Sequence, residues 1–330
     1  MKKTRVAVIG CGVIAPLHIE CYQALESVEV TWLCDIEPEK SARLAGQFGV
    51  DQTTTDAMEV FQAPDVDAVS ICTDHASHAD LAIAALRQGK DVLCEKALTQ
   101  NAEALDRLLA AAGKFPERIA AGVFQHRFDP VNREVRALLA ERQLGTLLTA
   151  TMQLRCFRSN EYYARDAWRG KWKTEGGSVL INQAIHFIDQ LLWLTGGMDR
   201  AAAMMTNLTH GDVIETEDTA AAVMKLKCGA IGTITATSSS HLGWEALLAF
   251  HGTDGAIEIH NDRIAKISFK DPAVEEGIRA RLDQAGTPKG AQAGKRYYGT
   301  GHPAQIADFV EAVKTRRPPF VPLESAAETA

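Results

Sequence analysis

The chain has 330 residues, with 35 lysines and arginines against 42 aspartates and glutamates, and a formal net charge of −7. This length is enough for two domains with a large core. The negative charge argues against nucleic acid or an anionic membrane as the main partner, and no apolar run reaches the length of a transmembrane helix. Seven cysteines are scattered without a C-x-x-C pair, which is typical of reduced thiols. We therefore expect a cytoplasmic protein, and we predict no metal site.

The first fifteen residues predict a dinucleotide-binding turn. The apolar stretch 5–9 runs directly into Gly10-Cys11-Gly12-Val13-Ile14-Ala15. Gly10 permits a tight turn, Gly12 lets backbone N–H groups approach a pyrophosphate, and the small Ala15 allows close packing of helix on strand. An ordinary strand-to-helix loop is the alternative interpretation, because glycine turns are common.

The end of the second strand indicates which dinucleotide is bound. The mostly apolar strand predicted at 28–34 leads to Asp35, at about the offset where a carboxylate binds the adenosine ribose hydroxyls. This carboxylate would repel a 2′-phosphate, and no arginine follows in Ile36-Glu37-Pro38. We predict NAD rather than NADP.

Strand and helix patterns alternate through residues 1–123, which predicts an α/β fold with a doubly wound parallel sheet, an N-terminal Rossmann domain. The predicted strands are 5–9, 28–34, 52–54, 66–72, 91–94 and 118–123, and the clearest helical patterns are 77–87 and 101–112.

Residues 124–330 have a different character and predict an α+β domain for substrate binding and oligomerisation. Helices are expected at 130–141, 178–194 and 302–314, and strands at 146–157, 201–207, 219–226, 230–238, 245–251 and 256–259. Consecutive strands with short turns predict a large, mostly antiparallel open sheet. Residues 271–300 are rich in Gly, Lys and Ala without clear periodicity, and we expect a mobile excursion there.

Two segments carry residues suited to chemistry. Lys96 directly follows a buried strand at the predicted cofactor crevice, where ligands of open α/β sheets bind; a surface lysine is the alternative. After Gly176-Gly177, Asn182 and His186 are four residues apart and would project from one helix face, with Asp189 close behind. A hydrogen-bonded core histidine is the alternative for His186.

The ordered motifs resemble the Gfo/Idh/MocA oxidoreductase family over nearly the whole chain. Residues 10–15 match its dinucleotide turn, 89–96 resemble its segment ending in Glu-Lys-Pro, and 125–130 match its domain-crossing motif. Residues 162–163, 168–170 and 176–189 resemble a sugar-oxidising subgroup that includes nucleotide-linked uronic acid 3-dehydrogenases.

The resemblance implies roles for individual residues. The implied cofactor contacts are Gly10, Gly12, Val13, Ile14, Asp35, Ile36, Thr73, Asp74, His78, Glu95, Lys96, Gln125, Trp168, Arg169 and Tyr298. The residues implied around the reacting carbinol are Lys96, Tyr163, Asn182 and His186, with His302 nearby. Two departures stand out: Ala97 replaces the family proline, so we expect Lys96 to be held less firmly, and Asn182 replaces an aspartate of inositol-type members, which removes an Asp–His dyad.

These observations favour an NAD-dependent dehydrogenase acting on a secondary alcohol of a sugar, sugar derivative or cyclitol. His186 would be the base and Lys96 would polarise the oxygen, although the reverse assignment stays open. An NADP-dependent reductase of an imine, dihydrodiol or keto-sugar, and a non-catalytic dinucleotide-binding regulator, are the rival hypotheses. We expect a homodimer or homotetramer formed through the C-terminal sheet.

A basic segment bears on substrate charge. Between positions 155 and 173 lie Arg155, Arg158, Arg165, Arg169, Lys171 and Lys173, against only Glu161 and Asp166. Arg158 and its neighbours would recognise an anionic group, such as a uronate carboxylate or a sugar-linked phosphate, through forked contacts. The alternative is a solvated loop, or arginines that serve the cofactor phosphates and a subunit contact.

Overall fold

The computed structural model describes residues 3–286 and 300–330, and the chain forms two compact units. The first consists of residues 1–124 with 302–328 and 330, and the second of 125–301 with 329. The sequence predicts one boundary, between residues 123 and 124, with all later residues in the second domain. The structure differs because the last helices return to the first unit, where Ile306, Phe309 and Val310 join its hydrophobic core.

The first unit contains a six-stranded parallel sheet in the order β3-β2-β1-β4-β5-β6, which confirms the predicted Rossmann topology. Its strands are β1 (Thr4–Ile9), β2 (Val28–Cys34), β3 (Gln52–Thr54), β4 (Ala68–Ile71), β5 (Asp91–Cys94) and β6 (Ala120–Gly122). The strand order reverses between β1 and β4. Ligands of open α/β sheets bind beyond the carboxyl ends of the strands at such a point.

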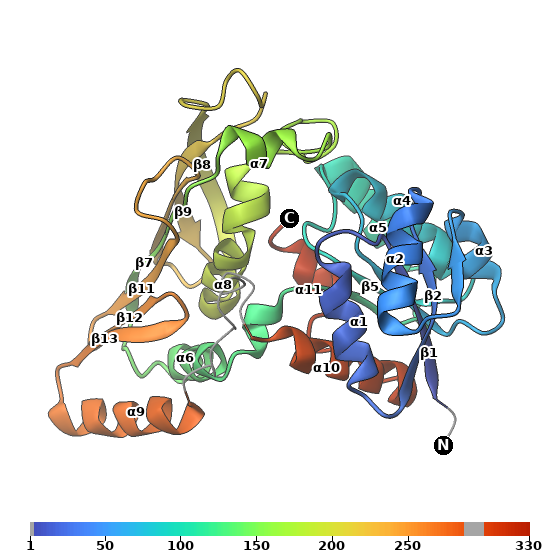
Figure 1. Cartoon of the computed structure of the whole chain (residues 1–330). Helices are drawn as coiled ribbons and strands as arrows, with labels where there is room; N and C mark the ends of the chain where they lie inside the picture. The colour runs from blue at the N-terminus through green and yellow to red at the C-terminus, as the bar shows by residue number, and fades with distance from the viewer. Residues whose placement is uncertain (1–2, 287–299) are drawn as a thin grey trace. The chain divides into compact units, whose positions relative to one another are not determined.

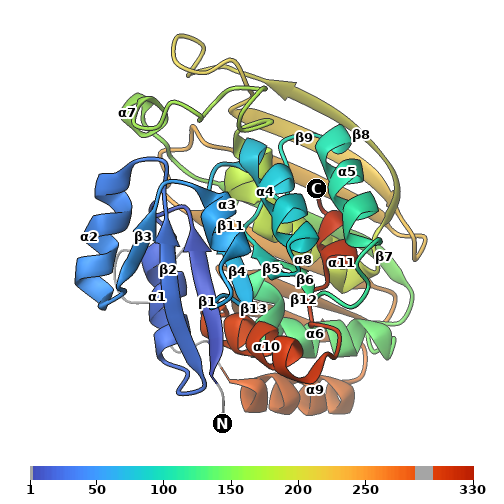
Figure 2. The ribbon, with the colours of Figure 1, turned by 90° about the vertical axis from the view of Figure 1, so that its right-hand side faces the viewer.

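The helices of this unit are α1 (Ala15–Gln23), α2 (Pro38–Phe48), α3 (Ala57–Gln62), α4 (His75–Arg87), α5 (Ala102–Ala112), α10 (His302–Thr315) and α11 (Leu323–Ala327). Helix α1 packs on β2 and α10, whereas α4 packs on β5 and α5 (Figure 2). Asp56, Asp74 and Asn101 accept backbone N–H groups at the starts of α3, α4 and α5. These caps explain why each helix begins where it does.

The second unit contains a seven-stranded sheet in the order β13-β12-β11-β7-β10-β9-β8. Its strands are β7 (Leu147–Arg155), β8 (Met198–Thr206), β9 (Thr219–Leu226), β10 (Ile231–Thr237), β11 (Glu245–Gly252), β12 (Gly255–His260) and β13 (Arg263–Phe269). Neighbouring strands are antiparallel except β7 and β10, so the predicted mostly antiparallel sheet is confirmed. Edge strand β13 was not predicted, because its exposed residues give only a weak alternating pattern.

One face of this sheet is covered by helices (Figure 1). They are α6 (Pro130–Ala140), α8 (Ile185–Thr195) and α9 (Pro272–Ala285), while α7 (Asn160–Ala164) and the 3₁₀ turn η1 (Gln125–Phe128) lie in connections. The helix expected over 178–194 begins instead with a π-helical segment, η2 (Val179–Ala184).

Helix α9 occupies part of the segment 271–300, for which the sequence predicts a mobile excursion. Asp271 caps it by accepting the N–H of Ala273, and Ile278 and Leu282 are its buried residues. Two buried positions are too few for the sequence to show a clear helical period. No described helix combines the length and the apolar character needed to cross a membrane.

Candidate active site

The glycine turn after β1 has the geometry that a pyrophosphate requires. Gly10 has φ +90°, and a Cβ there would lie 2.6 Å from the carbonyl oxygen of Cys72, so only glycine fits. A Cβ on Gly12 would meet nothing within 4 Å. Helix α1 starts just beyond, and its N-cap Ile14 supplies no side-chain cap for the first-turn N–H groups. The residues present therefore fit the phosphates of a dinucleotide.

The carboxylate of Asp35 lies beside this turn. Its Oδ2 accepts the N–H of Cys11 at 2.7 Å and its Oδ1 accepts the N–H of Glu37 at 2.9 Å. Two apolar side chains near the turn, Val13 and Ile36, are 62% and 86% exposed. Burial raises the pKa of the Cys11 thiol to about 12, which agrees with a packing role for that cysteine.

The residues that follow β4 form the first turn of α4. Asp74 accepts the N–H groups of Ala76 and Ser77, and the Ser77 hydroxyl donates to Thr73 Oγ1 at 2.7 Å. His78 is fully buried, and its ring nitrogens lie 2.7 Å from the carbonyl oxygen of Ala97 and 3.1 Å from that of Thr73. Burial lowers the pKa of His78. This imidazole therefore joins the loops after β4 and β5.

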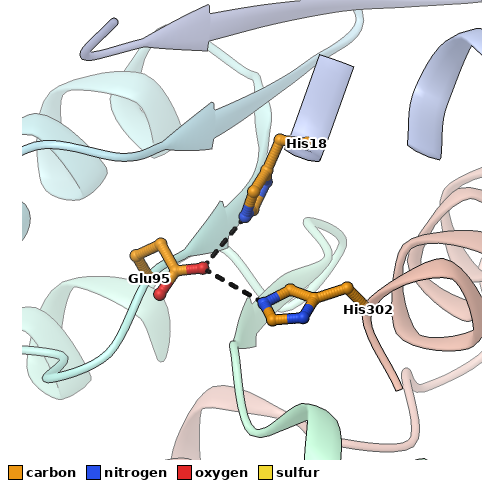
Figure 3. A group of neighbouring side chains, drawn as sticks. All are labelled: His18, Glu95 and His302. Atoms are coloured by element: carbon orange, nitrogen blue, oxygen red, sulfur yellow. Dashed lines mark hydrogen bonds and ion pairs between the residues drawn. The ribbon is translucent and has the colours of Figure 1, made fainter. Parts of the chain in front are cut away.

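Glu95, at the end of β5, is buried between two histidines (Figure 3). Its Oε1 lies 2.9 Å from Nε2 of His18 and 3.9 Å from Nε2 of His302. Burial disfavours the ionised carboxylate, but the hydrogen bond and charge of His18 outweigh it and lower the pKa of Glu95 to about 2. Sequence reasoning missed His18, for which a histidine in a mostly apolar first helix was the available signal.

Lys96 is half-buried, and the backbone around it is held within the first unit. Its N–H donates to Glu95 Oε2 at 3.1 Å, and the next carbonyl, that of Ala97, is bound by His78. The peptide bond between Lys96 and Ala97 is cis. The backbone is thus fixed by hydrogen bonds although the family proline is absent.

In the second unit, a buried carboxylate fixes the start of the helical segment that leads to His186. Glu217 Oε1 accepts the N–H groups of Ser178 and Leu180, both at 3.0 Å, and so caps η2. Gly177 has φ +154° just before this cap. His186 lies in the first turn of α8 and is 9% exposed. Sequence reasoning missed Glu217, which lies 39 residues further along the chain than Ser178.

Asn182 is bound to a second carboxylate that sequence reasoning missed. Its Nδ2 donates to Glu175 Oε1 at 2.5 Å, and Glu175 Oε2 accepts the N–H of Gly170 at 2.5 Å. Glu175 is fully buried. Asn182 is therefore held by the protein on its donor side.

The hydroxyl of Tyr163 belongs to an internal network. It donates to Ser238 Oγ at 2.9 Å and accepts from Ser178 Oγ at 3.0 Å. Burial raises its pKa to about 12, so the phenol stays protonated at neutral pH.

Three of the predicted arginines surround one aromatic ring. The guanidinium carbons of Arg158, Arg165 and Arg169 lie 4.7, 5.9 and 4.4 Å from the centroid of Tyr162. Arg169 also lies 4.6 Å from the ring of Trp168, and Arg158 lies 5.3 Å from that of Trp244. The structure therefore brings Arg158, Arg165, Arg169 and Trp168 together around Tyr162 in one cationic and aromatic cluster, which we call the Tyr162 cluster.

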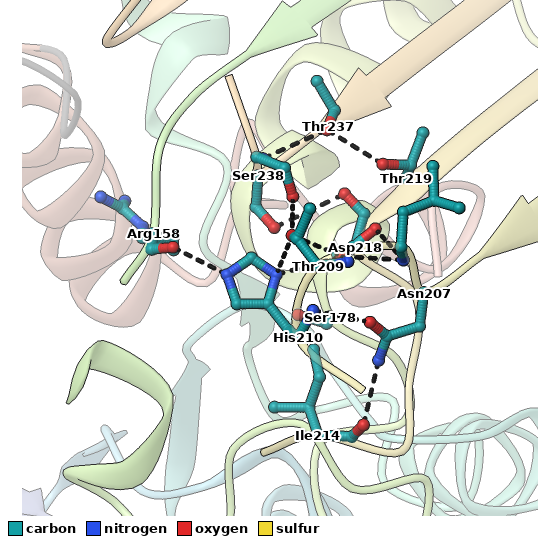
Figure 4. A network of polar contacts seen from close by, with 12 residues as sticks. Arg158, Ser178, Asn207, Thr209, His210, Ile214, Asp218, Thr219, Thr237 and Ser238 are labelled. Atoms are coloured by element: carbon teal, nitrogen blue, oxygen red, sulfur yellow. Dashed lines mark hydrogen bonds and ion pairs between the residues drawn. The ribbon is translucent and has the colours of Figure 1, made fainter. Parts of the chain in front are cut away.

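A polar network fixes the backbone of Arg158 (Figure 4). Its carbonyl oxygen accepts from Nε2 of His210 at 2.8 Å, and its N–H donates to the carbonyl of Ser238 at 2.8 Å. Nδ1 of His210 lies 3.1 Å from Oδ2 of the fully buried Asp218. Two further residues were predicted to contact the cofactor. Gln125 is fully buried in η1, and Tyr298 lies outside the described residues.

Two described clusters hold side chains of metal-ligating type: His18, Glu95 and His302, and His126, Asp129 and Asp262. In each, a histidine nitrogen lies at hydrogen-bond distance from a carboxylate oxygen, 2.9 Å for His18 and Glu95 and 3.1 Å for His126 and Asp262. An ordinary hydrogen bond between histidine and carboxylate accounts for each contact. We assign neither cluster to a metal.

Comparison with known proteins identifies the family. Residues 4–122 match the model of an oxidoreductase family with an NAD-binding Rossmann fold, GFO_IDH_MocA. Residues 132–258 match the GFO/IDH/MocA C-terminal domain. The chain belongs to the Gfo/Idh/MocA oxidoreductase family. The family binds NAD through its Rossmann fold, and the glycine turn of this chain lies in the matched region.

Among similar members of the Gfo/Idh/MocA family is the myo-inositol 2-dehydrogenase of Thermotoga maritima. It is 25% identical over 327 residues, which cover 96% of this chain and 90% of that protein. The levoglucosan dehydrogenase of Pseudarthrobacter phenanthrenivorans is 24% identical over 315 residues, with 84% and 80% of the two chains covered.

A solved structure, the WlbA dehydrogenase of Bordetella pertussis in complex with NADH and UDP-GlcNAcA, superposes with a TM-score of 0.88. The match covers 99% of this chain and 92% of WlbA at 24% identity, and it establishes the common fold.

Proposed function

We propose that this protein is an NAD-dependent dehydrogenase that oxidises a secondary alcohol of a sugar, sugar derivative or cyclitol. The observation that carries the proposal is the glycine turn, open at Gly12 and flanked by the Asp35 carboxylate, in a chain of an NAD-binding oxidoreductase family. The named relatives are dehydrogenases of inositol and levoglucosan, which are polyhydroxylated compounds. The polar side chains of Asn182 and His186 could form hydrogen bonds with the hydroxyl groups of such a substrate.

The proposed division of labour assigns each side chain one task. Bound NAD supplies the hydride acceptor, and the protein must orient the carbinol and take its hydroxyl proton. His186 accepts that proton, since an imidazole titrates near neutral pH, and Lys96 polarises the same oxygen. The buried Glu175 orients the Asn182 amide through its Nδ2, and the amide oxygen would accept a hydrogen bond from a substrate hydroxyl.

The rival functions have less support. The Asp35 carboxylate beside the glycine turn would repel a 2′-phosphate, which disfavours an NADP-dependent reductase. A non-catalytic regulator would have no need of a lysine after β5 or of a histidine on α8.

Substitutions of the two proposed catalytic groups test this assignment. Lys96→Met and His186→Phe should each lower kcat by about 10²-fold or more, the scale expected for loss of a positioned proton-transfer group. NAD reduction would be followed with a panel of inositols, aldoses, anhydrosugars and uronic acids. The exposed residues Lys114 and His251 provide matched controls, as Lys114→Met and His251→Phe. Near-wild-type turnover in both test variants would contradict the proposal.

The Tyr162 cluster supports recognition of an anionic group on the substrate. Asp166 accepts hydrogen bonds from Arg169 at 2.8 Å and from Arg165 at 3.2 Å, so these two arginines of the cluster share one negative charge. The backbone of Arg158 is fixed by His210 and Ser238, which suits a forked contact to a carboxylate or phosphate.

A comparison of a uronic acid with its neutral parent sugar tests this recognition. We expect kcat/KM for the uronic acid to fall as salt rises, and Arg158→Ala to raise KM more than it lowers kcat. Arg158→Lys keeps the charge without the fork and should recover part of the loss. Equal or better turnover of the neutral sugar would show that there is no anion site.

A further inference from the structure

Two histidine rings lie side by side in the second unit. The ring centroids of His126, in η1, and His186, in α8, are 5.2 Å apart, and the ring planes are tilted by 52°. His126 is 1% exposed and His186 is 9% exposed. Water therefore screens any charge on one ring poorly from the other.

Two carboxylates hold His126 from the side of its Nδ1. This nitrogen lies 3.1 Å from Oδ1 of Asp262 and 3.3 Å from Oδ2 of Asp129. Asp129 is also fixed by the hydroxyl of Thr300, which donates to its Oδ1 at 3.0 Å. Asp262 lies in the turn between β12 and β13.

This arrangement keeps His126 charged. Burial disfavours the imidazolium, but the charge of Asp262 and the hydrogen bonds to Asp129 and Asp262 outweigh it and raise the pKa of His126 to about 10. Burial likewise opposes ionisation of Asp262, and the positive charge of His126 overcomes it, so the pKa of Asp262 is lowered. At neutral pH His126 is therefore a buried cation.

Several other ionisable groups on α8 and on the elements that pack against it contact partners of their own. Arg127 is paired with Asp189 at 2.5 Å. Glu134 is paired with Arg281 and Glu245 with His260, while Arg133 lies over Phe128 and Arg136 over Trp193. The remaining ionisable groups on these elements are Arg155 on β7 and His251 on β11. The ring of His126 lies close to that of His186 in a tilted arrangement.

We propose that His126 acts as a fixed positive charge beside His186 and keeps the His186 imidazole neutral, and so able to accept a proton, at neutral pH. The inference rests on the proposed function in one respect, that His186 is the base. A proton added to His186 would place two like charges about 5 Å apart in a poorly screened interior. At that separation the expected shift in the His186 pKa is about one to two pH units.

Because His126 is a cation and its partners Asp129 and Asp262 are anions, removing the one or the other should move the His186 pKa in different directions. With His126→Gln, the cation is lost and both carboxylates remain, so the pKa of His186 should rise. With Asp262→Asn, one negative charge is lost while Asp129 still holds His126, so the pKa of His186 should stay or fall. His126→Arg keeps the positive charge and should restore the value of the unsubstituted protein. A purely structural role of His126 would not produce this order.

The direct measurement is an NMR titration of the histidine rings in the full chain saturated with NAD. We expect the His186 resonances of His126→Gln to titrate about one to two pH units higher. His210→Gln removes another buried, Asp-bound histidine of the same unit and should leave the His186 pKa unchanged. An unshifted His186 in folded His126→Gln, or a rise in Asp262→Asn, would overturn the proposal. If His126→Gln does not fold, Asp262→Asn provides the test: a fall in the His186 pKa would support the proposal, and a rise would overturn it.

The pH dependence of kcat/KM separates this inference from the proposed function. A base must be unprotonated, so the rate rises with pH up to its pKa, and His126→Gln should move that rise to higher pH by the NMR shift. The variant should be slow near pH 7 and recover at alkaline pH. A raised NMR pKa with an unmoved rate profile would mean that the coupling exists but His186 is not the base.

Discussion

At the scale of single residues, the polar chemistry of this protein depends on buried charges that meet partners distant in sequence. Glu95 contacts His18, 77 residues away, and His126 contacts Asp262, 136 residues away. A buried charge without such a partner would be strongly destabilising, so each contact fixes both side chains.

The separation of these partners along the sequence also limits which site residues could be predicted. Gly10 and Asp35 were predictable because a turn and a strand end are local features. Glu217, Glu175 and the partners of His126 could not be predicted, because each acquires its role only when the chain folds. Histidine and carboxylate side chains are common, and local spacing does not indicate which of them will meet.

The cofactor preference depends on one of these residues. Asp35 offers a carboxylate beside the glycine turn, so we expect tighter binding of NAD than of NADP, and Asp35→Ser should narrow the difference. Isothermal titration with both dinucleotides would measure it. Asp51 is an exposed aspartate of the same unit, and Asp51→Ser should leave the ratio unchanged. Tighter binding of NADP by the unsubstituted protein would contradict the prediction.

At the scale of elements, the connection from β8 to β9, residues 207–218, supports the Tyr162 cluster. Asp218 accepts the N–H groups of Leu208 and Thr209 and contacts His210, which in turn binds the Arg158 carbonyl. A loop that ends in a buried aspartate thus positions an arginine 60 residues earlier in the chain.

The elements themselves were predictable where their pattern is strong. Strands β2, β5 and β9 have the predicted bounds, because apolar runs ending at turn residues are clear signals. The polar strand β3 has the predicted bounds as well. The π-helical η2 was not predicted, because its sequence reads as ordinary apolar helix and the departure follows from tertiary contacts with Glu217.

Removal of the Asp218 charge should destabilise the protein in a pH-dependent way. Burial opposes its ionisation, but the N–H groups of Thr209 and Leu208 outweigh it and lower its pKa to about 2. A depressed carboxyl pKa stabilises the fold above the unfolded-state value of 3.8 and loses that effect as pH falls towards 2. Asp218→Asn should therefore cost about 2 kcal/mol at pH 7.

Urea unfolding at several pH values would measure this cost, and the difference from the unsubstituted protein should shrink below pH 4. Asp212 is exposed in the same connection, so Asp212→Asn should have little effect at any pH. A loss of stability in Asp218→Asn that is equal at all pH values would mean that the ionised carboxylate is not its source.

At the scale of the whole molecule, the chain uses its last residues to complete the first unit. Helix α10 packs on α1, and the Gln305 amide donates to the carbonyl of Gly122 at 2.8 Å. The sequence showed a final helix but not its destination, because Ile306, Phe309 and Val310 would suit the core of either unit.

The seven-stranded sheet leaves several apolar side chains exposed on the face away from its helices. Strand β8 is exposed along its whole length, and Met204, Val223 and Ile231 are 84%, 50% and 43% exposed. The register pairs Ile231 with Lys225 and Val223 with Thr233, so Val223 and Ile231 lie on the same face of β9 and β10. An apolar area of this kind marks an interaction surface.

We expect a second copy of the chain to cover this face, which gives a homodimer or homotetramer, the symmetric assemblies that are commonest among proteins. Light scattering after size exclusion should show the oligomer, and Val223→Asp with Ile231→Asp should yield monomers, because each partner would bury charges without counter-ions. Leu242 is an apolar residue 66% exposed in a loop, so Leu242→Asp should leave the oligomer intact. A monomeric unsubstituted protein at micromolar concentration, or an oligomeric double variant, would show that this face does not form the interface.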